Sequence, residues 1–244
     1  MNRINIRIFN QPWDANQFII NQWKEIGDEA VREKGNYTVA LSGGKTRVPL
    51  FRRLSQDTEN TCWRNTHIFM VDERFVPPGH PDSNQRMIRD NLIERTMIPN
   101  NHFHPYPIKK SITNSVITYQ RQLKHFFQLK AEELPVFDFV LLGIGQDGHT
   151  ASLFPENQKS YYHFNLVHAV RLSRLHTMRM TLTIPVLNQA KNIFFLVLGK
   201  QKSKIIKVLL EQKNKRLPAS RIDPVQGKLV MVLDLEAASL LRSP

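Results

Sequence analysis

The sequence predicts an α/β fold: a three-layer α/β/α sandwich built around a mostly parallel, doubly wound sheet. Short β-type runs alternate along the chain with longer amphipathic segments, and strands that are separated by helices usually pair in parallel. Two runs, residues 139–143 and 194–199, are almost wholly apolar, as expected of strands buried on both faces. The 244 residues, 41% of them hydrophobic, suffice for one large core.

The expected elements follow from period-2 or near-continuous apolar runs for strands and from 3.6-residue spacing for helices. In the first half we expect strands over 4–9, 37–42 and 66–73, and helices over 15–33, 48–54 and 84–93. In the second half we expect strands over 103–107, 137–143, 166–170, 180–187, 193–199 and 229–234, and helices over 115–131 and 203–212. Residues 77–82 and 213–223 have the composition of loops. Because no linker or repeat divides the chain, we expect a single domain over residues 1–244.

The composition limits the partners and the compartment. With 34 Lys and Arg against 21 Asp and Glu, the net charge of +13 would attract phosphorylated metabolites or nucleic acid, or serve solubility alone. The single cysteine, Cys62, excludes an intrachain disulfide, and its neighbour Trp63 favours a buried thiol in a reducing compartment. No apolar run approaches the ~18 residues that span a bilayer, and the first residues do not resemble a signal peptide. We expect a cytoplasmic protein with no membrane partner.

A Ser-Gly-Gly-Lys-Thr segment, residues 42–46, follows one of the expected strands. Ligands of open parallel sheets bind beyond the carboxyl ends of the strands, where this segment lies. Gly43 and Gly44 can expose successive backbone N–H groups to a phosphate, and Ser42, Lys45 and Thr46 add donors. The first glycine of the nucleoside-triphosphate loop is replaced by Val39, so a single phosphomonoester is favoured over a triphosphate, with an ordinary tight turn as the alternative.

The segment after the expected strand at 137–143 contains a formal G-x-G-x-x-G. It does not predict a dinucleotide site, because Asp147 would place a carboxylate against the pyrophosphate and Pro155 would shorten the following helix. Instead, glycines such as Gly145 let the backbone bend and leave Asp147 and His149 in the crevice. Histidine, with a reference pKa near ~6.5, can take a proton from water, and a carboxylate can fix its tautomer. The alternative is a packed histidine at a helix start.

Three further positions carry candidate anion contacts. Asp72 and Arg74 end the strand expected at 66–73, where Arg74 either forms an ion pair that holds the loop or grips a phosphate or carbonyl oxygen. Ser83 and Asn84 resemble a helix N-cap. Downstream, Arg179 and Lys202 are candidates for phosphate binding, Lys202 because it opens a helix after a buried strand.

Together these motifs resemble, in order and spacing, the 6-phosphogluconolactonases over most of the chain. The most specific is GQDGHTASLFP at 145–155, close to that family's GxDGHTASLFP, whereas SGGKT and VDERFVP are shared with related sugar-phosphate isomerases and deaminases. The resemblance implies hydrolysis of 6-phosphogluconolactone to 6-phosphogluconate in the oxidative pentose phosphate pathway, without a metal or organic cofactor. It also implies a small phosphosugar lactone as the partner. Apart from the resemblance, we expect no specific nucleic acid and a monomer or weak homo-oligomer.

The resemblance also implies roles for individual residues. His149 is expected to be the general base that activates water, with Asp147 beside it and Arg74 facing the substrate. Either Arg74 or loop N–H groups would stabilise the developing oxyanion. The expected substrate and phosphate site comprises Ser42, Gly43, Gly44, Lys45, Thr46, Asp72, Gly145, Arg179 and Lys202.

The sequence departs from the family pattern at two places. Arg47 stands where the family usually has proline, and the nearest proline is Pro49. Before Arg179, the stretch RLSRLHTM replaces the usual one, so Arg174 or His176 would supply phosphate contacts there.

Two alternative functions are open. A glucosamine-6-phosphate isomerase or deaminase would share the fold, although TASLFP after the DGH turn argues against it. A non-catalytic sugar-phosphate sensor would keep the loops and use the +13 charge on DNA, but no helix-turn-helix segment precedes the first strand.

Overall fold

A seven-stranded sheet forms the centre of the protein. The computed structural model describes residues 4–57, 62–156, 165–172, 177–212 and 214–242. The sheet order is β1-β10-β9-β6-β2-β3-β5, and each adjacent pair is parallel, as predicted. The strands are β1 (Asn5–Phe9), β2 (Tyr37–Leu41), β3 (Thr66–Met70), β5 (Phe103–His104), β6 (Phe139–Leu142), β9 (Asn192–Val197) and β10 (Lys228–Asp234).

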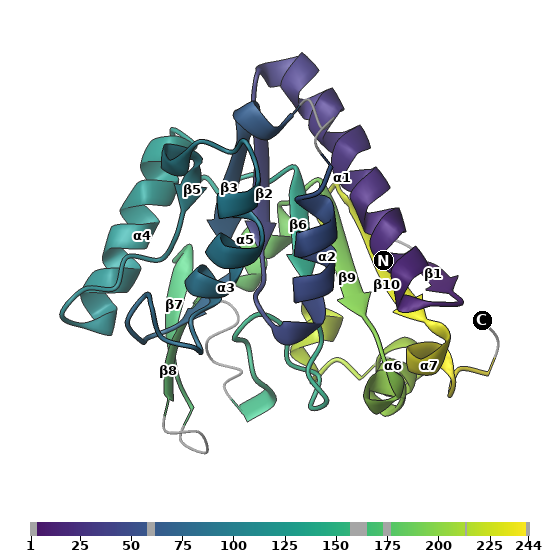
Figure 1. The fold of residues 1–244 in the computed structure, drawn as a ribbon. Coiled ribbons are helices and arrows are strands. Elements are labelled where there is room, and N and C mark those ends of the chain that lie inside the picture. The colour runs from purple at the N-terminus through teal and green to yellow at the C-terminus, as the bar shows by residue number, and fades with distance from the viewer. Residues whose placement is uncertain (1–3, 58–61, 157–164, 173–176, 213, 243–244) are drawn as a thin grey trace.

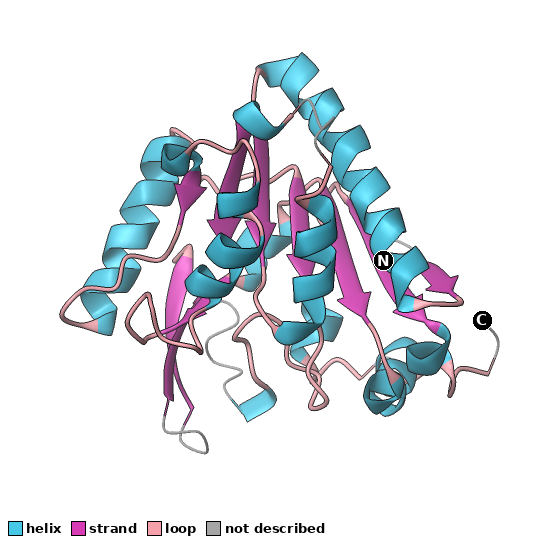
Figure 2. Ribbon diagram, viewed as in Figure 1, coloured by secondary structure: helices cyan, strands magenta, loops and turns pink. Residues whose placement is uncertain are grey.

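Helices cover both faces of this sheet (Figure 2). Figure 1 shows α1 (Pro12–Lys34) and α2 (Val48–Leu54) in front of the strands and α5 (Ile184–Asn188) behind them. The other helices are α3 (Asn84–Asn91), α4 (Ile112–Phe126), α6 (Ser203–Leu210) and α7 (Leu235–Ala238). The predicted three-layer arrangement is confirmed. Within the described ranges, no helix has both the length and the apolar composition needed to cross a bilayer.

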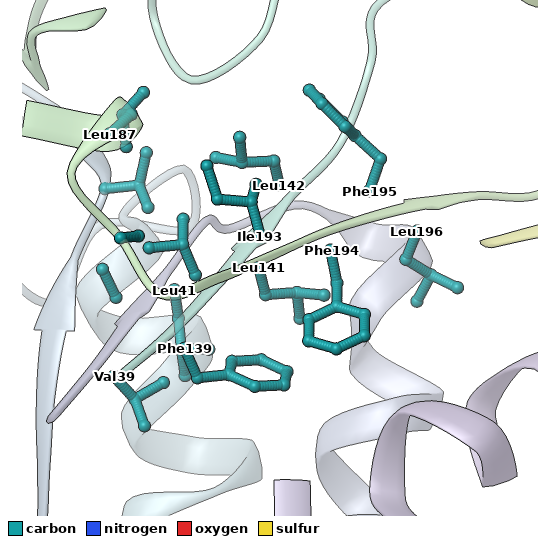
Figure 3. Packing of buried hydrophobic residues seen from close by; sticks show 14 of the residues in the cluster. Val39, Leu41, Phe139, Leu141, Leu142, Leu187, Ile193, Phe194, Phe195 and Leu196 are labelled. Carbon is teal, nitrogen blue, oxygen red and sulfur yellow. The ribbon is translucent and has the colours of Figure 1, made fainter. Parts of the chain in front are cut away.

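The core forms because the central strands are apolar on both faces. Neighbouring residues of a strand point to opposite sides, so Phe194 and Phe195 of β9 are buried against different layers (Figure 3). The ring of Phe194 stacks on that of Phe139 in β6, with 4.7 Å between centroids. Trp23 of α1 packs on the same side, 5.5 Å from Phe139. Cys62 is buried as predicted, and burial raises the pKa of its thiol to about 11.

Two expected boundaries are wrong for identifiable reasons. The helix expected at 115–131 is α4, which begins earlier because the Ser111 side chain caps it by accepting a hydrogen bond from the Asn114 N–H at 3.2 Å. The strand expected at 180–187 ends at Leu182, and α5 begins after Thr183. Pro185 lies in the first turn of α5, where a missing N–H removes no helical hydrogen bond.

A second sheet, which was not expected from the sequence, lies beside the first. Its three antiparallel strands, in the order β4-β8-β7, are β4 (Asp72–Arg74), β8 (Thr177–Leu182) and β7 (Val167–Leu172). The strand expected at 66–73 is therefore divided at Val71, and its last residues leave the main sheet. As a result Arg74 pairs directly across from Arg179. Like charges in that position repel each other, which favours an anion between or near them.

Candidate active site

A cavity of about 220 Å³ lies at the carboxyl ends of β2, β6 and β9. The antiparallel sheet contributes Asp72, Arg74 and Arg179 to its wall. The other lining residues are Ser42, Gly43, Gly44, Thr46, Arg47, Asn84, Gly143, Ile144, Gly145, His149, Ala151, Leu196, Val197, Leu198 and Lys202. The structure thus brings together most of the residues that the sequence singled out.

Two of the predicted site residues do not line the cavity. Lys45 is exposed, because the 3₁₀ turn Lys45–Arg47 directs its side chain to solvent and that of Arg47 inward. Asp147 is not among the lining residues but contacts His149, which is, and its charge also acts on Lys202 in the cavity wall. The alternative contacts Arg174 and His176 lie outside the described residues.

His149 and Asp147 form a hydrogen-bonded pair at the cavity. The His149 Nδ1 lies 2.5 Å from Asp147 Oδ1, and the backbone N–H of His149 donates to the same oxygen at 3.2 Å. An imidazole that donates from Nδ1 to a carboxylate keeps Nε2 as a proton acceptor. The His149 side chain is 31% exposed and its ring packs 4.4 Å from that of Phe154. The pair can therefore serve as an accessible, oriented base.

Glycines in the same loop make this pair possible. The Gly145 N–H donates to the His149 carbonyl at 2.8 Å, which closes the loop. A Cβ added at Gly145 would overlap the His149 ring and would lie 2.6 Å from Asp147 Oδ1. Gly148 has a φ of +82°, in the left-handed region that favours glycine. Any side chain at residue 145 would displace the base.

Glu73 holds the wall that carries Arg74. Its buried carboxylate accepts hydrogen bonds from the backbone N–H groups of Arg74, Asn84 and Gln85 at 2.7, 2.8 and 2.7 Å. The Ser83 hydroxyl, which also caps α3 as predicted, donates to it at 3.0 Å. Burial raises the pKa of Glu73, and these four hydrogen bonds oppose that rise. Glu73 is therefore a structural anchor that does not touch the cavity.

Hydrogen bonds, and no ion pair with a described residue, orient the Arg74 side chain. Its Nη1 donates to Asn84 Oδ1 at 2.5 Å and to the Asp82 carbonyl at 2.9 Å, and no described carboxylate lies within salt-bridge distance of it. The Asn84 amide in turn donates to the Asp72 carbonyl at 3.0 Å. Asp72 Oδ2 accepts from the Ser152 hydroxyl at 2.6 Å. The sequence predicted Asn84 only as part of the helix N-cap and not as a residue of the cavity. The one sequence signal for its role was its position directly after the capping Ser83.

Cations outnumber carboxylates in the cavity. Arg47, Arg74, Arg179 and Lys202 line it, whereas Asp72 is the one lining carboxylate among the described residues. Burial lowers the pKa of Arg179 and of Lys202, and Arg47 lowers that of Lys202 further. Within the described part of the chain, Ser42 Oγ and Arg179 Nε are buried without a hydrogen-bond partner. These features fit a ligand that carries an anionic, oxygen-rich group.

No three His, Cys, Asp or Glu side chains in the described ranges are grouped so that they could hold a metal ion. The expectation of a reaction without metal or cofactor remains a prediction.

Comparison with known proteins identifies the family. The family described as glucosamine-6-phosphate isomerases/6-phosphogluconolactonase matches residues 13–231. The chain belongs to this family. Among its members, the 6-phosphogluconolactonase of Synechocystis sp. is 38% identical over 217 residues, which are 88% of either chain, and that of Nostoc sp. is 34% identical over 216 residues, again 88% of either.

A solved structure of the same family extends the likeness to the fold. The 6-phosphogluconolactonase from Trypanosoma brucei superposes with a TM-score of 0.86 at 28% identity, covering 98% of this chain and 99% of that one. The resemblance drawn from the DGH turn and the other motifs is thereby confirmed at the level of family and fold.

Proposed function

We propose that the protein hydrolyses 6-phospho-D-glucono-1,5-lactone to 6-phosphogluconate, as a carboxylic ester hydrolase of the oxidative pentose phosphate pathway. The observation that carries this proposal is the His149–Asp147 pair at a cavity lined by four cations. The names of the relatives in Synechocystis and Nostoc support the choice of substrate.

In this proposal the phosphate determines how the substrate lies. The turn after β2 offers backbone N–H groups and the Ser42 and Thr46 hydroxyls, and Arg179 and Lys202 add charge from β8 and from the segment before α6. Charge-assisted hydrogen bonds of ~1.5–3 kcal/mol each would fix the phosphate. The lactone carbonyl at the other end of the molecule is then presented to His149.

The chemistry needs one base and one oxyanion donor. His149 Nε2 takes a proton from water as the oxygen adds to the lactone carbonyl, and Asp147 stabilises the imidazolium. The resulting oxyanion is stabilised by Arg74 or by loop N–H groups. Collapse of the tetrahedral intermediate breaks the bond to the ring oxygen, which receives the proton from His149. The product is the open hydroxy acid, and no step requires a cofactor.

The test is turnover of freshly generated lactone, measured as acid release above the spontaneous rate. His149→Ala should lower kcat by about 10²–10⁴-fold, because general-base catalysis contributes that much, while the affinity for 6-phosphogluconate stays within a few-fold. The exposed His125 on α4 provides the matched control, and His125→Ala should keep full activity. An intact protein that leaves the lactone untouched but releases ammonia from glucosamine 6-phosphate would move the assignment to the isomerase or deaminase alternative.

The remaining expectations go with this proposal. A cytoplasmic location, a monomer or weak homo-oligomer and the lack of a specific nucleic-acid partner remain predictions. The sensor alternative predicts binding of the phosphosugar without any turnover, so the same assay separates it from the lactonase.

A further inference from the structure

Arg47 is buried in the turn after β2. Arg47 is 7% exposed, and its Nη1 donates a hydrogen bond to the Gly43 carbonyl. A Cβ added at Gly143, in the loop after β6, would overlap the Arg47 guanidinium. The side chain therefore lies between the two loops that bound the cavity, in a space that glycine at 143 leaves open.

This guanidinium is a buried charge without a counter-charge in the described part of the chain. Burial lowers the pKa of Arg47 to about 10, so that the group is still charged at neutral pH. No described carboxylate forms a salt bridge with it, and its Nε is buried with no hydrogen-bond partner among the described residues. The more distant charge of Asp72 raises the pKa of Arg47, and the positive charge of Arg74 lowers it.

Buried charges in proteins are normally paired, because an unpaired one carries a large desolvation cost. The Arg47 guanidinium lies next to Gly44 and lines the same cavity as the buried Ser42 hydroxyl, which also has no partner among the described residues. A ligand anion in the turn would supply the missing counter-charge. A phosphomonoester suits it, since the planar fork of a guanidinium matches two phosphate oxygens.

We infer that Arg47 is a further binding residue of this site and contacts the phosphate of the substrate directly, at a position where the resembling family usually has proline. The identity of the substrate rests on the proposed function, but the contact itself does not. A purely structural role is the competing explanation, in which Arg47 only joins the two loops through the Gly43 carbonyl.

Three substitutions separate the two roles. Arg47→Gln keeps an amide that can donate to the Gly43 carbonyl but removes the charge, Arg47→Lys keeps the charge without the planar fork, and Arg47→Met keeps only the stem. Dissociation constants for inorganic phosphate and for 6-phosphogluconate are measured by calorimetry, and KM and kcat by lactone turnover. The matched control is Arg52→Met, which removes an exposed charge from α2, where Arg52 bonds to Asn91 at 2.8 Å.

Direct contact predicts that Arg47→Gln and Arg47→Met weaken the binding of 6-phosphogluconate by about 10- to 150-fold. Arg47→Lys should lose less affinity. KM should rise in parallel and kcat change less than about threefold, because the phosphate is held equally in ground and transition states. The Arg52→Met variant should bind within twofold of the wild type. Arg47→Gln that binds phosphate like the wild type, or an equal loss in Arg52→Met, would overturn the inference.

The calorimetric binding measurements do not depend on catalysis. A wild-type protein that binds 6-phosphogluconate through Arg47 but does not hydrolyse the lactone would refute the proposed function and leave the contact intact. Conversely, a protein that hydrolyses the lactone with an unchanged KM in Arg47→Gln would refute the contact alone. Failure of the wild type to bind either phosphate compound would also overturn the inference.

Discussion

His149 is oriented by two small features of its loop. Asp147 fixes the ring through Nδ1 at 2.5 Å, and Gly145 leaves the space in which the two side chains meet. Neither feature alone suffices, because a carboxylate two residues away can reach the imidazole only if the backbone between them bends sharply. The orientation of the base therefore depends on the bend in the backbone as well as on the histidine.

Gly145→Ala tests this at a single atom. The new Cβ would overlap the His149 ring, so we expect kcat to fall by about 10²-fold, as misplacing a catalytic group by ~1 Å typically does. The melting temperature should change little, since the overlap falls on the partly exposed His149 and Asp147 side chains and not on the hydrophobic core. Lactone turnover and a thermal melt measure the two effects. Gly79→Ala is the control, because a Cβ there meets nothing within 4 Å, and equal activity of the two variants would contradict the argument.

The limits of the sequence prediction are clearest at Arg47 and Lys45. The order of motifs was enough to place His149, Arg74 and Lys202 at one cavity. It could not show that the turn Lys45–Arg47 is a 3₁₀ turn, which exposes the lysine and buries the arginine. Which of two neighbouring cations points inward depends on backbone dihedral angles that neither residue type determines.

The junction between β4 and α3 depends on one carboxylate. Glu73 accepts four hydrogen bonds, three of them from backbone N–H groups at the start of α3 or in β4. We predict that Glu73→Gln lowers the free energy of unfolding by about 2–3 kcal/mol. The substitution replaces one accepting carboxylate oxygen with an NH₂ group, which cannot accept the hydrogen bonds that the surrounding N–H and O–H groups donate. Urea unfolding measures the change. The exposed Glu94 offers the control, and Glu94→Gln should stay within about 0.5 kcal/mol.

A loss of that size would also disturb Arg74 and Asn84, which Glu73 positions through the backbone. We therefore expect lactone turnover by Glu73→Gln to fall even under conditions where the protein is fully folded. A variant as stable as the wild type would show that the hydrogen bonds are replaced by water.

A cluster of histidines lies at the edge of the sheet formed by β3 and β5. His67 Nδ1 lies 3.1 Å from His104 Nε2, and the ring of His102 stacks on His67 at 3.8 Å. Burial, with the nearby His102, His104 and Lys34, lowers the pKa of His67 from 6.5 to about 4, and burial with His102 does the same for His104. The unfolded chain therefore takes up protons at a higher pH than the folded protein.

Stability should be independent of these groups above pH 6.5 and should fall as the pH drops from 6.5 towards about 4. We predict that His67→Phe makes this fall shallower, whereas His125→Phe, at an exposed position of α4, leaves it unchanged. Urea midpoints between pH 7 and pH 4 measure the slope. Equal slopes in all three proteins would show that other groups cause the acid sensitivity.

At the level of elements, the apolar strands were predictable and the small sheet was not. β6 and β9 are nearly continuous hydrophobic runs, so their place in the centre of the sheet follows from composition. β4 has only three residues, and its pairing with β8 joins segments that nothing in the local sequence relates. The change from β8 to α5 had a local signal in Thr183 and Pro185, which the apolar run obscured.

The whole molecule has one principal hydrophobic cluster, which runs from Ala15 in α1 to Ala238 in α7 among the described residues. We therefore propose that the chain unfolds as a single cooperative unit, in agreement with the expected single domain. Tryptophan fluorescence reports Trp23 and Trp63 in that cluster, together with the exposed Trp13. This fluorescence and far-ultraviolet circular dichroism should give coincident urea transitions. Two separated transitions would show that the chain contains independently folding parts.

The position of β2 in the sheet has a consequence for synthesis. Its neighbour β3 follows soon after it in the chain, but its other neighbour is β6. Asp138, directly before β6, accepts a hydrogen bond from Thr38, which lies 100 positions earlier in the chain. At usual translation speeds β2 would wait roughly 5–20 seconds with one edge unpaired before its second partner leaves the ribosome. A strand edge without a partner pairs readily with other chains, so the nascent chain is prone to aggregate during this interval.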